Sequence, residues 1–190
     1  MTFDLTKFAG VSAVALALAG TPALAQEAWE GWDVDTDGIL TEQEFVEGFN
    51  TRATFGTWDV NTDAMLDETE LYDGVWGLYD RDATDALEEA EVEPFETDWA
   101  EGGIWYDDAN VIEAWDVDGD GIILQNEYTD SIGEVGLLGN LDANADGSVD
   151  EDELATGVFD RYDEDDDGVI QEPELTDIGD DMGDEGFWDV

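Results

Sequence analysis

Two kinds of metal-binding and catalytic side chain are missing from this sequence of 190 residues, which contains no cysteine and no histidine. Without them no disulfide can form, and zinc, copper and haem sites lose their usual ligands. Neither a Ser-His-Asp nor a Cys-His catalytic arrangement can be built. Oxygen atoms are almost the only ligands left, and in large numbers they favour hard cations such as calcium, magnesium or the trivalent lanthanides.

Basic residues are scarce. Four lysines and arginines stand against 54 aspartates and glutamates, so the formal net charge is −50. Nucleic acids and anionic membranes bind through basic surfaces, and we expect neither as a partner. Such a charge favours disorder, but 42% of the residues are hydrophobic and 11% aromatic, too many for a solvated acidic tail. We therefore expect a fold that depends on bound metal ions.

Long hydrophobic runs are absent too. The longest run, residues 8–18, is far shorter than the roughly 20 residues of a membrane-spanning helix. It follows Lys7 and precedes Ala23-Leu24-Ala25. This pattern predicts a signal peptide over residues 1–25, cleaved after Ala25, and hence a periplasmic or extracellular protein with no membrane insertion.

The acidic residues follow a strict spacing. Six segments of 12 residues, which we call loops 1 to 6, place oxygen-bearing side chains at their positions 1, 3, 5 and 12. The positions 1, 3, 5, 7 and 12 are Asp33, Asp35, Asp37, Ile39 and Glu44 in loop 1; Asp59, Asn61, Asp63, Met65 and Glu70 in loop 2; Asp80, Asp82, Thr84, Ala86 and Glu91 in loop 3; Asp116, Asp118, Asp120, Ile122 and Glu127 in loop 4; Asp142, Asn144, Asp146, Ser148 and Glu153 in loop 5; and Asp163, Asp165, Asp167, Val169 and Glu174 in loop 6. Position 9 adds Asp67 in loop 2 and Asp150 in loop 5.

This spacing resembles the metal loop of EF-hands. In that family the side chains at positions 1, 3 and 5 turn inward, position 7 offers its backbone carbonyl, and the glutamate at position 12 binds through two oxygens. The two-oxygen glutamate favours calcium over magnesium, whose strict octahedron has no room for a seventh oxygen. The resemblance implies an all-α fold and up to six bound calcium ions.

Two further positions test the resemblance. Position 8 is apolar in paired EF-hands, where it forms a short β-contact between two loops, and it is apolar in all six loops here: Leu40, Leu66, Leu87, Ile123, Val149 and Ile170. Position 6 needs a positive φ angle, which glycine supplies without strain. Loops 1, 4, 5 and 6 have glycine there, but loop 2 has Ala64 and loop 3 has Asp85. Loops 2 and 3 therefore fit the pattern least.

The loops form a duplicated unit. Loops 1, 2 and 3 map onto loops 4, 5 and 6 with one constant offset in the numbering (33 to 116, 59 to 142, 80 to 163). We expect two three-loop halves, residues 26–95 and 96–178, followed by an acidic tail, residues 179–190. Pro94 and Gly102-Gly103 should break any helix between the halves.

The connections between loops within each half are short. We therefore expect one helix to serve two successive loops, which holds these loops at opposite ends of the helix. Such a helix predicts that loops 1 and 3 pair, that loops 4 and 6 pair, and that loops 2 and 5 meet across the halves.

Two alternatives to a simple calcium binder remain open. The signal peptide and the acidic, loop-rich chain are similar to lanmodulin, the periplasmic lanthanide-binding family of methylotrophic bacteria, but that family has four loops with proline at position 2, and no loop here has it. The calcium loops also resemble those of dockerins, which implies a calcium-stiffened structural or adhesive module with a protein partner. An enzyme is not expected, because the well-placed acids are already accounted for as metal ligands.

Overall fold

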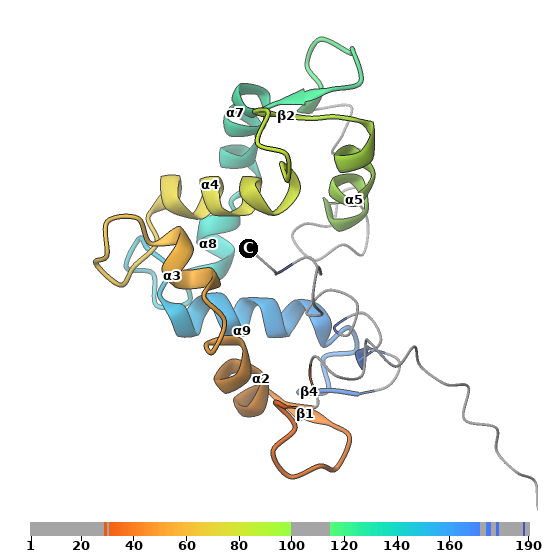
Figure 1. The fold of residues 1–190 in the computed structure, drawn as a ribbon. Coiled ribbons are helices and arrows are strands. Elements are labelled where there is room, and N and C mark those ends of the chain that lie inside the picture. The colour runs from red at the N-terminus through yellow and green to blue at the C-terminus, as the bar shows by residue number, and fades with distance from the viewer. Residues whose placement is uncertain are drawn as a thin grey trace, which may run out of the picture.

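The computed structural model describes residues 31–99 and 115–171, together with Trp29, Glu174, Leu175, Ile178 and Trp188. The proposed signal peptide lies outside the described residues, as does the acidic tail except for Trp188. The described part of the chain is mainly helical, with short antiparallel β-contacts (Figure 1). None of its helices combines the length and the apolar character that crossing a membrane requires.

The elements of the first half recur in the second. The first half contains β1 (Leu40–Thr41), α2 (Glu42–Phe49), α3 (Thr54–Trp58), α4 (Glu68–Tyr79), β2 (Ala86–Leu87) and α5 (Glu89–Trp99). The second contains β3 (Ile123–Leu124), α7 (Gln125–Val135), α8 (Leu137–Leu141), α9 (Glu151–Tyr162) and β4 (Val169–Ile170). The offset that relates the loops also carries β1 onto β3, α3 onto α8, α4 onto α9 and β2 onto β4, with the same first and last positions.

The end of each loop starts the next helix. In loop 2 the Asp67 carboxylate accepts the backbone N–H groups of Thr69 and Glu70, both at 2.9 Å, and the Glu70 side chain accepts the N–H of Asp67. This capping box satisfies N–H groups that the first turn of α4 leaves without partners. Because the N-cap is position 9 and the returning glutamate is position 12, one short sequence both closes the loop and begins the helix.

A shared helix between loops is confirmed for residues 68–79. There α4 is a single helix of 12 residues that leaves loop 2 and enters loop 3, and α9 does the same between loops 5 and 6. The expectation is wrong between loops 1 and 2, where two short helices, α2 and α3, replace the single one. Phe49 and Phe55, one in each short helix, are both buried, so the bend between these helices buries both ends of the connection.

Pro94 does not end a helix as predicted, because it lies inside α5. Proline removes one hydrogen bond from a helix interior and normally bends or breaks it. Phe95 and Trp99, four residues apart on one face of α5, are both 0% exposed. Their burial against Tyr79 and Trp115 outweighs the lost hydrogen bond and keeps the segment helical.

The loops pair across the two halves (Figure 1). Strand β1 of loop 1 pairs with β4 of loop 6, with Leu40 opposite Ile170, and β2 of loop 3 pairs with β3 of loop 4, with Leu87 opposite Ile123. The predicted contact between loops 2 and 5 is confirmed by an isolated antiparallel bridge between Leu66 and Val149.

The predicted pairings of loop 1 with loop 3 and of loop 4 with loop 6 are wrong. Each shared helix does hold its two loops apart, as expected. Helix α2, which follows loop 1, packs against α9, which enters loop 6, and loops 1 and 6 pair. Helix α4, which enters loop 3, packs against α7, which follows loop 4, and loops 3 and 4 pair. The contacts between these helices, which the sequence does not display, decide which loops face each other.

Aromatic side chains form much of the buried core. Phe95, Trp115 and Tyr128 contact one another with ring centroids 5.0 to 6.2 Å apart. The buried Tyr128 hydroxyl donates a hydrogen bond to the carbonyl of Tyr72 at 2.9 Å and so connects α7 to α4. Near the C-terminus Trp188 is 1% exposed and contacts rings of α2 and α3. The residues just before loops 2 to 6 are buried core residues, namely Trp58, Tyr79, Trp115, Leu141 and Tyr162, while Trp32 before loop 1 is partly buried.

Candidate metal centres

Four loops gather three carboxylates each. One carboxylate oxygen from each of positions 1, 3 and 12 lies within 4.8 Å of the others in loops 1, 3, 4 and 6. The groups are Asp33, Asp35 and Glu44; Asp80, Asp82 and Glu91; Asp116, Asp118 and Glu127; and Asp163, Asp165 and Glu174. Oxygens at this separation can share one hard cation. The structure thus brings together the acids at positions 1, 3 and 12 of these four loops, which are three of the five predicted ligand positions.

All six loops have the same hydrogen-bonded frame at position 1. The two oxygens of this aspartate accept the backbone N–H groups of positions 5 and 6 at 2.8 to 3.2 Å, with Asp33, Asp59, Asp80, Asp116, Asp142 and Asp163 as the acceptors. The side chain at position 1 therefore holds the turn closed from inside. Loops 2 and 5 share this frame with the four three-carboxylate loops.

The glutamate at position 12 crosses each loop. One of its oxygens accepts the N–H of position 9 at 3.0 to 3.3 Å in every loop. The other oxygen accepts the N–H of position 2 in the three-carboxylate loops, for example Val117 at 3.1 Å from Glu127. In loops 2 and 5 it accepts the N–H of position 3 instead, at Asn61 and Asn144. Glutamate is thus already directed into the loop.

Loops 2 and 5 differ from the others in their ligand set. Asparagine occupies position 3 in both, so Asn61 and Asn144 would offer an amide oxygen in place of a carboxylate. The acids at position 9, Asp67 and Asp150, each cap a helix through one oxygen. At positions 1, 3, 5 and 12 these two loops carry one carboxylate fewer than loops 1, 4 and 6 and the same number as loop 3, where Thr84 stands at position 5, but they keep the hydrogen-bonded frame at position 1.

Loop 3 departs from the pattern at two predicted ligands. The Thr84 hydroxyl at position 5 donates a hydrogen bond to the Ala86 carbonyl at position 7, with an oxygen–oxygen distance of 3.2 Å. The two groups that were predicted to bind a metal ion bind each other here. Coordination by the Ala86 carbonyl would require this hydrogen bond to weaken.

The backbone of every loop turns through positive φ angles at positions 4 and 6. Ala64 and Asp85 at position 6 have φ of 68° and 61°, so the loops without glycine adopt the same turn. Sequence reasoning missed position 4, which has positive φ as well and carries glycine only in loop 4: Thr36, Thr62, Ala83, Gly119, Ala145 and Asp166. The residue types gave no signal for it, apart from Gly119.

The buried acids of the loops require a counter-charge. Asp33, Asp59 and Asp163 at position 1 and Glu70, Glu127 and Glu174 at position 12 are all buried. Burying ionised carboxylates is costly unless a positive charge compensates them. The whole sequence holds only four basic side chains, so a bound cation is the natural counter-charge.

Two loop acids have a raised pKa, because desolvation and the charges of neighbouring carboxylates both disfavour the ionised form. Desolvation, followed by the charge of Asp37, raises the pKa of Asp35 above its usual value, and desolvation with the charge of Asp167 raises that of Asp165. Glu44 behaves in the opposite way, since hydrogen bonds from the hydroxyl and the N–H of Thr41 lower its pKa. In loops 1 and 6 the acid at position 3 thus meets repulsion from its neighbours in addition to desolvation, and a cation between the carboxylates would relieve the repulsion.

Comparisons with known proteins do not assign this chain to a family. No protein-family model matches the chain, and no curated protein shows significant similarity to it. The four acidic groups are compatible with metal binding on geometry alone.

Proposed function

We propose that this chain is an exported calcium-binding protein whose six loops are of the EF-hand type. One observation carries the proposal: in four separate loops the side chains at positions 1, 3 and 12 converge with carboxylate oxygens within 4.8 Å. The shared backbone frame of loops 2 and 5 supports two further, weaker sites. The proposed role is the binding of ions in the periplasm or outside the cell, with no catalytic step.

Calcium fits the loops better than magnesium does. In loops 1, 4 and 6 the glutamate at position 12 can supply two oxygens, the aspartates at 1, 3 and 5 one each, and the carbonyl of position 7 another, which reaches the lower end of the six to eight oxygens that calcium takes. Magnesium would require a strict octahedron and would keep several waters. Calcium therefore suits a loop that can close around it without a rigid cage.

Titration calorimetry with Glu127→Gln tests the assignment. This change removes the charged ligand at position 12 of loop 4 and keeps the side-chain volume, so the variant should bind one calcium ion fewer than the parent. Glu134→Gln, an exposed position on the same helix α7, is the matched control and should keep the parent number. If the Glu127→Gln protein retains every ion, loop 4 is not a calcium site.

A lanthanide-binding role is the second candidate, because hard oxygen ligands also suit trivalent ions. Binding by itself does not separate the two, since a higher charge strengthens attraction to the same carboxylates. The two candidates are separated by which ion completes the fold. Under the calcium proposal, millimolar calcium alone produces the complete change in helicity and tryptophan emission. If only a lanthanide produces it, the second candidate replaces the first.

A further inference from the structure

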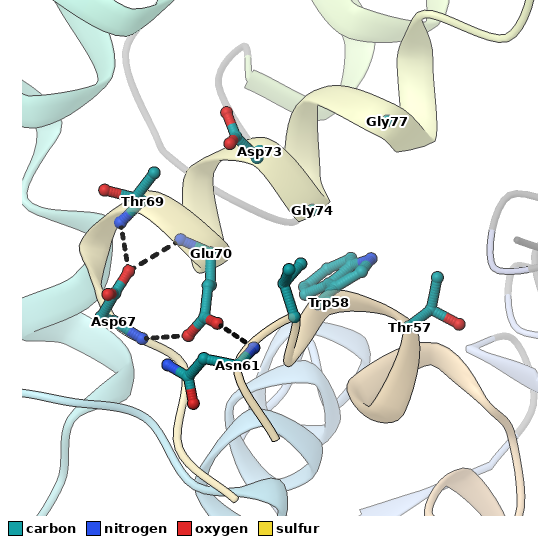
Figure 2. A pocket seen from close by; sticks show the side chains of 10 residues that line it. Thr57, Trp58, Asn61, Asp67, Thr69, Glu70, Asp73, Gly74 and Gly77 are labelled. Atoms are coloured by element: carbon teal, nitrogen blue, oxygen red, sulfur yellow. Dashed lines mark hydrogen bonds between the residues drawn. The ribbon is translucent and has the colours of Figure 1, made fainter. Parts of the chain in front are cut away.

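A pocket of about 640 Å³ lies between α3 and α4, beside loop 2 (Figure 2). Its apolar wall consists of Trp58, Val60, Gly74 and Gly77, and its acidic rim includes Asp67 and Asp73. This size and this mixture are typical of a small-molecule site, which is mostly apolar with a few polar groups. No lysine or arginine occurs among the residues that line it.

Two glycines of α4 shape the pocket in different ways. A Cβ atom on Gly74 would lie 2.2 Å from Cδ2 of Trp58, so the glycine lets the indole lie against the helix. A Cβ atom on Gly77 would meet no atom within 4 Å. Glycine costs a helix about 1 kcal/mol relative to alanine, and at Gly77 no close packing requires it. Its effect is to leave the space beside Trp58 open.

The corresponding place in the second half has different residues. At the offset that relates the two halves, Trp58, Val60 and Gly77 become Leu141, Ala143 and Asp160. The large aromatic wall, the exposed valine and the second glycine therefore belong to the first half alone. The repeat accounts for the metal loops in both halves, but it does not account for this combination of residues.

The charged residues that line the pocket are all acidic. Asp67 uses its Oδ1 atom to cap α4, and Asp73 lies exposed at the rim, in the second turn of the helix. Glu70 lies between them and directs its carboxylate toward the N–H groups of Asn61 and Asp67 (Figure 2). A ligand that enters this space meets carboxylates at its polar end and, along its body, the exposed Val60 and the small exposed part of Trp58, whose side chain is otherwise buried.

We propose that this pocket binds a small organic cation, with a primary ammonium group at the Asp67–Asp73 rim and an apolar body against Trp58 and Val60. Charge complementarity selects the cation, since the rim is acidic and the protein carries a net charge of −50. The apolar wall selects against a bare metal ion, which would gain nothing from it. This inference goes beyond metal binding, but the pocket shares Asn61, Asp67 and Glu70 with loop 2, so the ammonium group binds beside whichever ion that loop holds.

Calorimetry with phenethylammonium, performed on the full chain in millimolar calcium at physiological salt, tests the proposal. One saturable site is expected for phenethylammonium, and at least about tenfold weaker binding for the neutral phenethyl alcohol, which has the same ring and chain. Equal binding of the two compounds would contradict the charge argument. Saturation by a lysine-containing peptide without saturation by phenethylammonium would also overturn the proposal and would assign the pocket to a protein partner.

Variants locate the site. Gly77→Leu should fill the pocket and abolish the saturable binding, while Gly139→Leu on α8 is the matched control, because a Cβ there also meets no atom within 4 Å. Both replace an exposed helical glycine with a better helix former, so both should fold. Asp73→Asn should weaken the binding of phenethylammonium by about threefold, as expected for an exposed charge, and Asp130→Asn on α7 should leave the binding unchanged. Unchanged binding in Gly77→Leu would refute the location.

Discussion

Among single residues, those at the positive-φ positions distinguish the loops in a way that their ligands do not. Loop 4 has glycine at both positive-φ positions, Gly119 and Gly121. Loop 2 has none, because Thr62 and Ala64 stand there with φ of 60° and 68°. A residue other than glycine, asparagine or aspartate costs about 1 kcal/mol or more in this region. The folded form of loop 2 therefore starts at a disadvantage that its ligand set does not reveal.

Ala64→Gly should strengthen calcium binding at loop 2. Relief of about 1 kcal/mol of strain corresponds to roughly fivefold tighter binding. Gly147→Ala makes the reverse change at the equivalent position of loop 5, where a Cβ would meet no atom within 4 Å, and should weaken that loop by a similar factor. Calorimetry of both variants measures the two shifts. Shifts in the same direction would show that backbone strain does not set these affinities.

At the scale of elements, each loop is completed by a loop of the other half. The hydrogen bonds between Leu66 and Val149, at 2.8 and 3.0 Å, join loop 2 to loop 5. Strands as short as these are not stable alone, so the β-contact forms only when both loops are shaped correctly. Closing one loop around an ion should therefore help its partner to close.

The observed pairing predicts which loop responds to a defect in another. Glu44→Gln removes the charged ligand at position 12 of loop 1 and should lower the calcium affinity of its partner, loop 6. In a nitrogen-15 NMR titration, the amide signal of Gly168 in loop 6 should shift at a higher calcium concentration than in the parent. The signal of Gly121 in loop 4 should shift at the same calcium concentration as in the parent. A delayed response of Gly121 instead would contradict the pairing of β1 with β4.

At the scale of the whole molecule, charge opposes the compact state. A net charge of −50 repels itself, and six buried acids in the loops add a desolvation cost. The metal binding proposed above would lower both the charge repulsion and the desolvation cost, so its free energy would become folding free energy.

Removal of metal should unfold or expand the protein. Helicity by circular dichroism should fall, and the radius by small-angle scattering should rise, when a chelator replaces millimolar calcium. Sodium chloride at high concentration is the control for general screening, and it should restore only part of the change because it does not fill the loops. An unchanged radius and helicity in chelator would disprove metal-coupled folding.

The halves should not fold as separate monomers. The β-contacts of the described loops cross between the halves, and so does the hydrogen bond from Asn50 to Asp152 at 3.0 Å. Residues 26–99 alone should therefore remain largely unfolded in calcium, as should residues 100–190, and an equimolar mixture should regain helicity. A half that is helical and monomeric by light scattering would show that the contacts between halves are dispensable.

Features that depend on near neighbours in the chain could be predicted from the sequence. The spacing of Asp33, Asp35 and Glu44, repeated in loops 3, 4 and 6, predicted four groups that the structure brings together. Leu71 and Val75 are apolar and four residues apart, a spacing that predicts one buried face of a helix, and both are buried in α4. These features were readable because a tight metal loop and one helix face depend on neighbours in the chain.

How the loops pair and how the helices pack depends on contacts that form only in the folded molecule. The partner of each loop, the continuation of α5 through Pro94 and the division of residues 42–58 into two helices all depend on packing between segments far apart in the sequence. The pocket beside Trp58 likewise exists because α3 and α4 approach each other at Gly74. Hydrophobic contacts are not directional, so a linear pattern shows which faces will be buried but not what they are buried against.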